Sequence, residues 1–242
     1  MSTEEFIINV NGMRVDVVRK AIKNLHLAVY PPKGRVRVAA PHVMSNDAIR
    51  LAVIDKLGWI KRQQASFAKQ PRQSEREMVT GETHYLLGRR FRMRKIAREG
   101  RIQIEQIGIS TICLFAPSTA TAEDREAALL RWYRSKLKEE AESLFAKWQQ
   151  IIGVKTSSWG IRRMKTKWGS CNTQSKRIWL NLELAKKPLE CIEYIVVHEL
   201  AHLIERHHND RFIAVMDKHL PQWRLIRKLL NSAPLKHEDW IY

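Results

Sequence analysis

Apolar and polar residues alternate with a period of two in several short runs of the first 117 residues, a pattern typical of β-strands. Residues 6–10 and 13–18 flank Asn11-Gly12, a pair that favours a tight hairpin turn. Similar runs occupy residues 25–30, 36–38, 84–87, 91–96, 102–107 and 109–115. Apolar residues at steps of three and four over residues 45–68 predict one helix between these strands. The region 1–117 is therefore predicted to be β-rich with one helix.

Helical spacing is more prominent in the second region, residues 118–242. Thr121 can cap a long amphipathic helix over residues 122–152, and Gly153 can end it. Residues 155–161 and 177–182 are predicted strands. The block between them, residues 162–172, is predicted to be a loop in which Gly169 frees the backbone.

A buried helix is predicted next, because apolar residues recur at helical spacing over residues 192–204 and no Gly or Pro occurs between Pro188 and Pro221. Two short helices, at residues 212–218 and 222–230, are expected to follow and to brace it. The predicted fold class is α+β, arranged as two regions, 1–117 and 118–242, or as one compact unit.

The apolar helix contains the sequence H-E-x-x-H at His198, Glu199 and His202. Two residues four apart on a helix point within about 40° of each other, so both imidazoles can bind one metal ion. Glu199 shares that side and can take a proton from water that the ion activates. An exposed helix can carry this string by chance. Here the apolar surroundings favour a metal site, because burying these groups without a partner would be costly.

A catalytic zinc ion usually takes three protein ligands and leaves a position for water, so a third ligand is required. Glu205, His207 and His208 all follow closely enough to supply it. The long-spaced metzincin pattern has Gly three residues after the second histidine. Glu205 occupies that position here, which argues against a metzincin.

The chain is strongly basic, with 43 Lys and Arg against 25 Asp and Glu and a net charge of +18. Such a charge favours polyanions, and nucleic acid is a possible partner through the basic surface. Basic residues are concentrated at residues 89–101 and 155–177. The strand R-R-F-R-M-R-K alternates basic and apolar residues, so one face can meet an anionic partner. A solvated face explains the alternation equally well.

Three cysteines, Cys113, Cys171 and Cys191, show no C-x-x-C spacing, which favours a reducing compartment over a disulfide framework. Cys113 and Cys191 lie in apolar runs typical of a core, whereas Cys171 is a less favoured candidate for a reactive thiol or a fourth metal contact. His84 is expected to be hydrogen-bonded or at the surface. The sequence has no signal-like start and no apolar run of 18 residues, so a cytoplasmic protein without a membrane segment is expected.

Two blocks in order carry a family resemblance: R-R-M-K-T-K-W-G-S-C-N at residues 162–172 and V-V-H-E-L-A-H-L at residues 196–203. They resemble the YgjP-like metallopeptidases, predicted metal-dependent hydrolases related to the SprT and WLM groups of zincins. That family continues with a segment ending in N-H-S and then an aromatic residue. Its third ligand maps onto His208, with His207 and Asn209 replacing the usual Asn and Ser and Phe212 supplying the aromatic.

The resemblance implies a zincin-like core, in which the active-site helix packs under a small sheet and a long backing helix. It implies one Zn²⁺ per chain, held by His198, His202 and His208, with Glu199 as general base for hydrolysis of a peptide bond. The strand at residues 177–182 would then lie at the lip of the cleft, where an extended peptide can pair with it. An ordinary core strand is the alternative.

Two other functions fit the same residues. A basic cleft with a divalent ion also suits a nucleotide substrate, as in a nucleoside triphosphate pyrophosphatase or phosphohydrolase. A nucleic-acid-associated zinc protein would instead have a structural site closed by four protein ligands. The group that stabilises the oxyanion is not identified by the sequence, and weak candidates are Arg163, Lys165, Lys167 and His219. His219 and Trp223 can approach the site, although packing is their simpler role.

Overall fold

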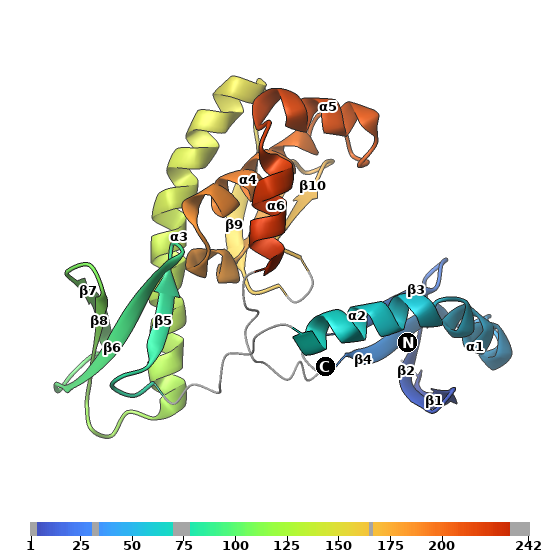
Figure 1. Ribbon diagram of the computed structural model, residues 1–242, viewed down its shortest axis with the longest axis horizontal. Helices are drawn as coiled ribbons and strands as arrows, with labels where there is room; N and C mark the ends of the chain where they lie inside the picture. The colour runs from blue at the N-terminus through green and yellow to red at the C-terminus, as the bar shows by residue number, and fades with distance from the viewer. Residues whose placement is uncertain (1–3, 31–33, 70–77, 165–166, 233–242) are drawn as a thin grey trace. The chain divides into compact units, whose positions relative to one another are not determined.

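The computed structural model describes residues 4–30, 34–69, 78–164 and 167–232, which form a mixed α+β fold with three small sheets (Figure 1). Contacts divide the described residues into two compact units, 4–69 and 78–232. The sequence predicted two regions, 1–117 and 118–242, or one compact unit. Residues 78–116 instead share one hydrophobic core with the long helix that follows them, because Phe91 and Leu114 belong to the same cluster as Leu129 and Tyr133.

The N-terminal unit is a four-stranded sheet with two helices. Its strands are β1 (Glu4–Val10), β2 (Met13–Lys20), β3 (His26–Tyr30) and β4 (Arg35–Pro41), in the order β1-β2-β4-β3. The predicted hairpin is confirmed, with Val10 paired to Met13, and β3 pairs with β4 in antiparallel orientation. The turn between β3 and β4 includes residues 31–33, outside the described residues. The buried side chains are mainly valine and isoleucine: Val15, Val17, Val36, Val38, Ile49, Val53 and Ile60.

The single helix predicted over residues 45–68 is instead two helices, α1 (Asn46–Asp55) and α2 (Leu57–Lys69). Ser45 caps α1 by accepting a hydrogen bond from the amide of Ala48 at 3.1 Å. The break occurs at Lys56, whose amide donates to the carbonyl of Val53, three residues back, at 3.1 Å. This tighter bond replaces the four-residue spacing of an α-helix and ends α1.

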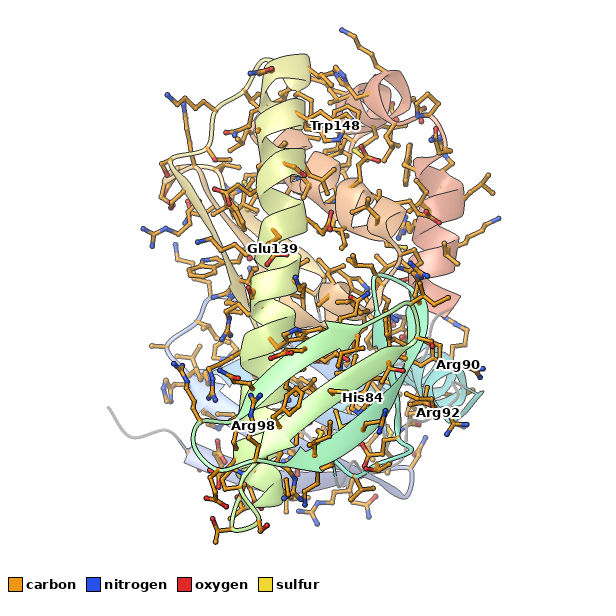
Figure 2. All side chains as sticks on the ribbon, turned by 90° about the vertical axis from the view of Figure 1, so that its left-hand side faces the viewer. His84, Arg90, Arg92, Arg98, Glu139 and Trp148 are labelled. Carbon is orange, nitrogen blue, oxygen red and sulfur yellow. The ribbon has the colours of Figure 1, made fainter. Side chains whose placement is uncertain are left out.

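The second unit begins with a sheet of β5 (Thr83–Leu86), β6 (Arg89–Ala97), β7 (Gln103–Ile107) and β8 (Thr111–Ala116), in the order β5-β6-β8-β7. Its apolar face packs against the long helix α3 (Ala122–Ile152), and Figure 2 shows the sheet lying in front of that helix. The predicted ends of α3 are confirmed. Thr121 forms a capping box with Asp124, and Gly153 adopts the left-handed conformation at φ 77°.

The remaining sheet contains β9 (Ser158–Arg162), β10 (Gly169–Asn172) and β11 (Arg177–Asn181), in the order β10-β11-β9. One sequence prediction is wrong here, and of the two roles considered for the strand at residues 177–182 the core strand is the one observed. The block predicted as a loop contains β10, and β11 is the central strand, hydrogen-bonded on both sides. An extended peptide therefore cannot pair with β11, because both its edges are occupied.

A short 3₁₀ helix (Leu182–Lys186) follows β11 and leads to α4 (Leu189–Ala201), α5 (Asp210–His219) and α6 (Trp223–Ser232). The buried helix predicted around H-E-x-x-H is α4, and the two short helices predicted after it are α5 and α6. The second half of α3 runs beside α4, so α3 supports both the first sheet and the helix that carries the motif (Figure 1). Among the described helices, none is long and apolar enough to cross a membrane.

Candidate metal centre

Three histidines converge at the end of α4. His198 lies in the last turn of the helix, His202 is its C-cap residue, and His208 comes from the loop before α5. Each offers a ring nitrogen, and these atoms all lie within 4.8 Å of one another. The Nε2 atoms of His198 and His208 are 3.1 Å apart. The residues predicted as metal ligands are thus brought together by the fold.

The other two candidates for the third ligand do not join this group. His207 is exposed, and its amide donates a hydrogen bond to the side chain of Glu205 at 3.1 Å. Glu205 is half-buried. The group that could hold a metal in the described part of the chain has three members, and Glu205 and His207 are not among them.

Hydrogen bonds and the aromatic ring of Phe212 hold the three histidines in place. The Nδ1 atom of His202 lies 3.2 Å from the carbonyl oxygen of Glu205, so its Nε2 is left for an ion. Asn209 caps α5 by accepting a hydrogen bond from the amide of Phe212 at 3.1 Å, which fixes the loop at His208. The ring of Phe212 contacts all three imidazoles, with centroid distances of 5.0, 4.8 and 4.8 Å.

The environment favours neutral imidazoles, which are the form that binds metals. Burial, followed by the neighbouring His202 and His208, lowers the pKa of His198 to about 3. Burial also lowers the pKa of His202. The Nδ1 atom of His198 is buried without a hydrogen-bond partner in the described structure, whereas its Nε2 faces His208. Three convergent neutral nitrogens fit the donor set of a zinc ion that keeps a position for water.

Glu199 lies beside the histidine group and is 4% exposed. Burial raises the pKa of its carboxyl group to about 8, although the charge of Lys167 acts in the opposite direction. Gly169 of β10 packs directly on this side chain. A β-carbon at residue 169 would lie 2.4 Å from Oε1 of Glu199. The sequence predicted that Gly169 frees the backbone of a loop; in the structure it makes room for the carboxylate, and its φ is not in the left-handed region.

A cleft of about 670 Å³ opens over these residues. One wall is β10 with the turn after it, and the others come from α4, the loop beyond it and α6. Sequence reasoning missed several lining residues, including Tyr194, Arg206 and Arg227. Tyr194 could have been found, because it precedes His198 by four residues and so shares its face of α4. No local signal in the sequence points to Arg227, which α6 brings in from a distant segment.

The other candidates named from the sequence fall into two groups. Cys171 and Lys167 line the cleft, whereas Arg163 and His219 do not, and Lys165 lies outside the described residues. Burial raises the pKa of the Cys171 thiol to about 11, with a further contribution from Glu199, so the nucleophilic thiolate is disfavoured. Cys171 is also not a member of the metal group.

Packing accounts for the remaining residues. Trp223 is buried and stacks on Tyr194 with ring centroids 6.3 Å apart. Cys113 and Cys191 are buried core residues, as predicted. His84 is fully buried in the first sheet, where its Nε2 lies 3.3 Å from Oε2 of Glu82. This histidine is paired with a carboxylate, which agrees with the hydrogen-bonded alternative.

Comparisons with known proteins define the class of protein as a metal-dependent hydrolase. A family model described as YgjP-like, metallopeptidase domain, matches residues 23–233. The chain therefore belongs to the YgjP-like metallopeptidase family. A search of curated proteins found no match.

Among solved structures, the chain is similar to two metallopeptidase zymogens from archaea. Abylysin of Pyrococcus abyssi is 24% identical, with 39% of this chain and 99% of that chain covered and a TM-score of 0.33. Jannalysin of Methanocaldococcus jannaschii is 20% identical, with 37% of this chain and 92% of that chain covered and a TM-score of 0.34.

Proposed function

We propose that the protein is a zinc-dependent peptidase in which His198, His202 and His208 hold one Zn²⁺ and Glu199 is the general base. The observation that carries this proposal is the convergence of three histidine nitrogens within 4.8 Å of one another, beside a buried carboxyl group in an open cleft. A site with three protein ligands leaves a coordination position free. This supports a catalytic site over a structural one closed by four protein ligands.

The chemistry divides between the ion and Glu199. A bound zinc ion would polarise the scissile carbonyl group and lower the pKa of the attacking water. Glu199 accepts a proton from that water on a carboxylate oxygen and then donates it to the leaving amine. Burial raises the pKa of the Glu199 carboxyl group to about 8, close to neutral pH, and a carboxylate with a raised pKa is a stronger proton acceptor. Of the weak candidates for stabilising the oxyanion, Lys167 is the one that lines the cleft among the described residues.

An extended polypeptide can bind along β10. This strand lines the cleft and pairs with β11 on one side, and no strand in the described structure pairs with its other edge. Backbone groups of an unpaired edge can form main-chain hydrogen bonds with an added strand. The strand proposed to pair with an extended peptide is therefore β10, and not β11 as the family resemblance implied.

The substitution E199Q tests the mechanism, because glutamine keeps the shape of the side chain but cannot accept the proton. We expect E199Q to retain one zinc ion per chain, measured by metal analysis, and to lose peptide hydrolysis by at least about 100-fold, the lower range of general-base contributions. Retained turnover with zinc bound would eliminate Glu199 as the base. Loss of zinc from the variant would instead assign Glu199 a role in metal binding.

A nucleotide substrate is the alternative within the same enzyme class. The observation that favours it is the presence of Lys167, Arg206 and Arg227 in the lining of the cleft, since these side chains can also bind phosphate groups. Incubating the zinc-loaded protein with unstructured polypeptide and, separately, with nucleoside triphosphates distinguishes the two. Phosphate or pyrophosphate release without peptide cleavage would favour the nucleotide hydrolase.

Nucleic acid is a second candidate partner, and it is favoured by one face of the first sheet. Phe91 and Met93 are buried, so the alternate residues Arg90, Arg92 and Arg94 of β6 point away from α3, and all three are exposed. Figure 2 shows Arg90 and Arg92 close together on this sheet. Fluorescence anisotropy with single-stranded DNA at several salt concentrations tests the interaction. A triple substitution of these arginines to Gln should lower both the affinity and its salt dependence.

We also propose that the protein is located in a reducing compartment. This location is supported by the three cysteines, Cys113, Cys171 and Cys191, none of which forms a disulfide. Localisation of the tagged protein by fractionation would test the expected cytoplasmic location.

A further inference from the structure

The charged residues that line the cleft are nearly all of one sign. Lys167, Arg206 and Arg227 are basic, and Glu199 is the only acid in the described lining. The three basic side chains come from the segment before β10, the loop after α4, and α6, so they surround the centre from separate parts of the fold. All three residues are exposed, whereas Glu199 is buried. The field in the open part of the cleft is therefore positive.

Cations elsewhere in this unit are often paired with acids. Arg224 of α6 forms an ion pair with Asp217, and Lys147 of α3 lies 2.8 Å from Glu193. In contrast, no ion pair or side-chain hydrogen bond joins Lys167, Arg206 or Arg227 to another described residue.

The acid adjacent to Arg206 in the chain is also engaged elsewhere. The carboxylate of Glu205 accepts a hydrogen bond from the amide of His207 at 3.1 Å, and it is not part of the lining. The basic groups of the cleft are therefore available to an external anion.

The cations of this rim lie in the same cleft as the reaction centre. Lys167 and Arg227 line it together with His198 and Glu199. An anionic group held by these side chains would consequently lie next to the bond that is broken, and not at a remote part of the substrate.

We propose that the cleft selects polypeptides with Asp or Glu side chains beside the scissile bond, and that Arg206, Arg227 and Lys167 form the subsite for these carboxylates. This inference rests on the proposed peptidase function. Arginine binds carboxylates through two parallel hydrogen bonds, which gives the subsite its chemical preference. A cleft with one sign of charge also concentrates oppositely charged ligands and raises their association rate by about 10- to 1,000-fold. Neutral polar residues of the lining, such as Asn172 and Gln174, remain available for the peptide backbone.

Matched peptides test the preference. Three peptide series are identical except for the residue beside the cleaved bond, which is Glu, Gln or Lys. The kcat/KM of each series is measured with the zinc-loaded full chain. We expect Glu peptides to be cleaved at least about tenfold better than Gln peptides, with the advantage falling as salt screens the charges. R206E and R227E should each reduce or reverse the Glu-to-Lys ratio. K228E is the control, because Lys228 is the exposed neighbour of Arg227 on α6 but does not line the cleft.

Binding separates this proposal from the proposed function. E199Q retains the subsite but should not cleave, so the affinity for fluorescent Glu, Gln and Lys peptides can be measured by anisotropy without turnover. Tighter binding of the Glu peptide that is lost in E199Q/R206E/R227E supports the subsite even where no peptide is hydrolysed. Equal binding and equal cleavage of the three series would overturn it. Preferential binding and hydrolysis of nucleoside triphosphates would overturn the peptide substrate class.

Discussion

Gly169 and Glu199 are packed so closely that a β-carbon on the glycine would lie 2.4 Å from Oε1 and 2.8 Å from Cδ of the carboxyl group. Real β-carbons do not approach other atoms this closely, so Glu199 keeps its position only with glycine at residue 169. The neighbouring backbone of β10 is held by pairing with β11 and cannot easily move away. Strand and carboxylate are thus fixed against each other.

G169A should therefore displace the Glu199 carboxylate. A shift of about 1 Å in a catalytic group costs roughly 100-fold in rate, so we expect kcat to fall by at least that factor. Zinc content, measured by metal analysis, should remain near one per chain because the three atoms nearest to the added β-carbon all belong to Glu199 and none to a histidine. The control is G58A, where the added carbon meets nothing closer than 3.5 Å. Full activity of G169A would show that Glu199 is not confined by this contact.

Removing the side chain of Asn181 should loosen the segment that carries Lys167. Asn181 is 5% exposed, and its Nδ2 donates to the carbonyl oxygens of Met164 and Lys167 at 2.7 and 2.8 Å. Leaving buried backbone groups without partners costs about 1–3 kcal/mol each. We expect N181A to lower the free energy of unfolding, measured in urea, by an amount of this order, and to lower kcat/KM as well. Q222A, at an exposed position of the same unit and outside the lining of the cleft, provides the comparison; an equal loss in both variants would contradict a special role for Asn181.

Removal of metal should destabilise the second unit. Substitution of His208 should lower the Tm of the metal-loaded protein more than substitution of His207. A ligand present at about 100 times its Kd adds about 2.7 kcal/mol to the free energy of unfolding. Chelation is expected to lower the Tm of the wild type and of H207A, measured by differential scanning calorimetry. H208A should already have the lower Tm and should respond little to the chelator. If H207A and H208A exchange these behaviours, the third ligand is His207.

Lys187 gives the protein a pH-dependent stability. Burial lowers the pKa of this ammonium group to about 8 from 10.5, with Glu183 opposing the change. Between these values the unfolded chain binds more protons than the folded chain, so this residue makes the free energy of unfolding increase as the pH rises above about 8. Below pH 8 the ammonium group is charged in both the folded and the unfolded chain. Burying that charge in the folded chain then lowers the free energy of unfolding. The ammonium group contacts the ring of Trp168 at 5.3 Å, which offsets part of that cost.

K187M removes this titration. We expect the free energy of unfolding, measured in urea, to increase more for the wild type than for K187M between pH 7 and pH 9. The comparison stops at pH 9 because burial raises the pKa of the Cys171 and Cys191 thiols to about 11, from 9.0, which lowers stability at higher pH. A difference that stays constant over this range would show that Lys187 titrates normally.

The sequence predicted those parts of the fold that local chemistry decides. Asn11-Gly12 defines a hairpin turn, and Thr121 and Gly153 define both ends of α3. The strand β10 was not predicted, because the four residues G-S-C-N carry no alternating pattern and become a strand only by pairing with β11.

The histidines and Glu199 were found because one helical turn places them together, but the cations of the cleft were found only in the structure. Arg227 is 28 residues beyond Glu199 and reaches the site through the packing of α6 against α4. Residue patterns within a single element cannot reveal such a meeting.

Asn209 caps α5 immediately after His208, so the folding of that helix fixes where the third imidazole stands. The ring of Phe212, one turn further on, supports all three histidines from the same helix. The third imidazole is consequently tied to the start of α5, so unfolding of this one helix would remove both that ligand and the ring that packs on the other two.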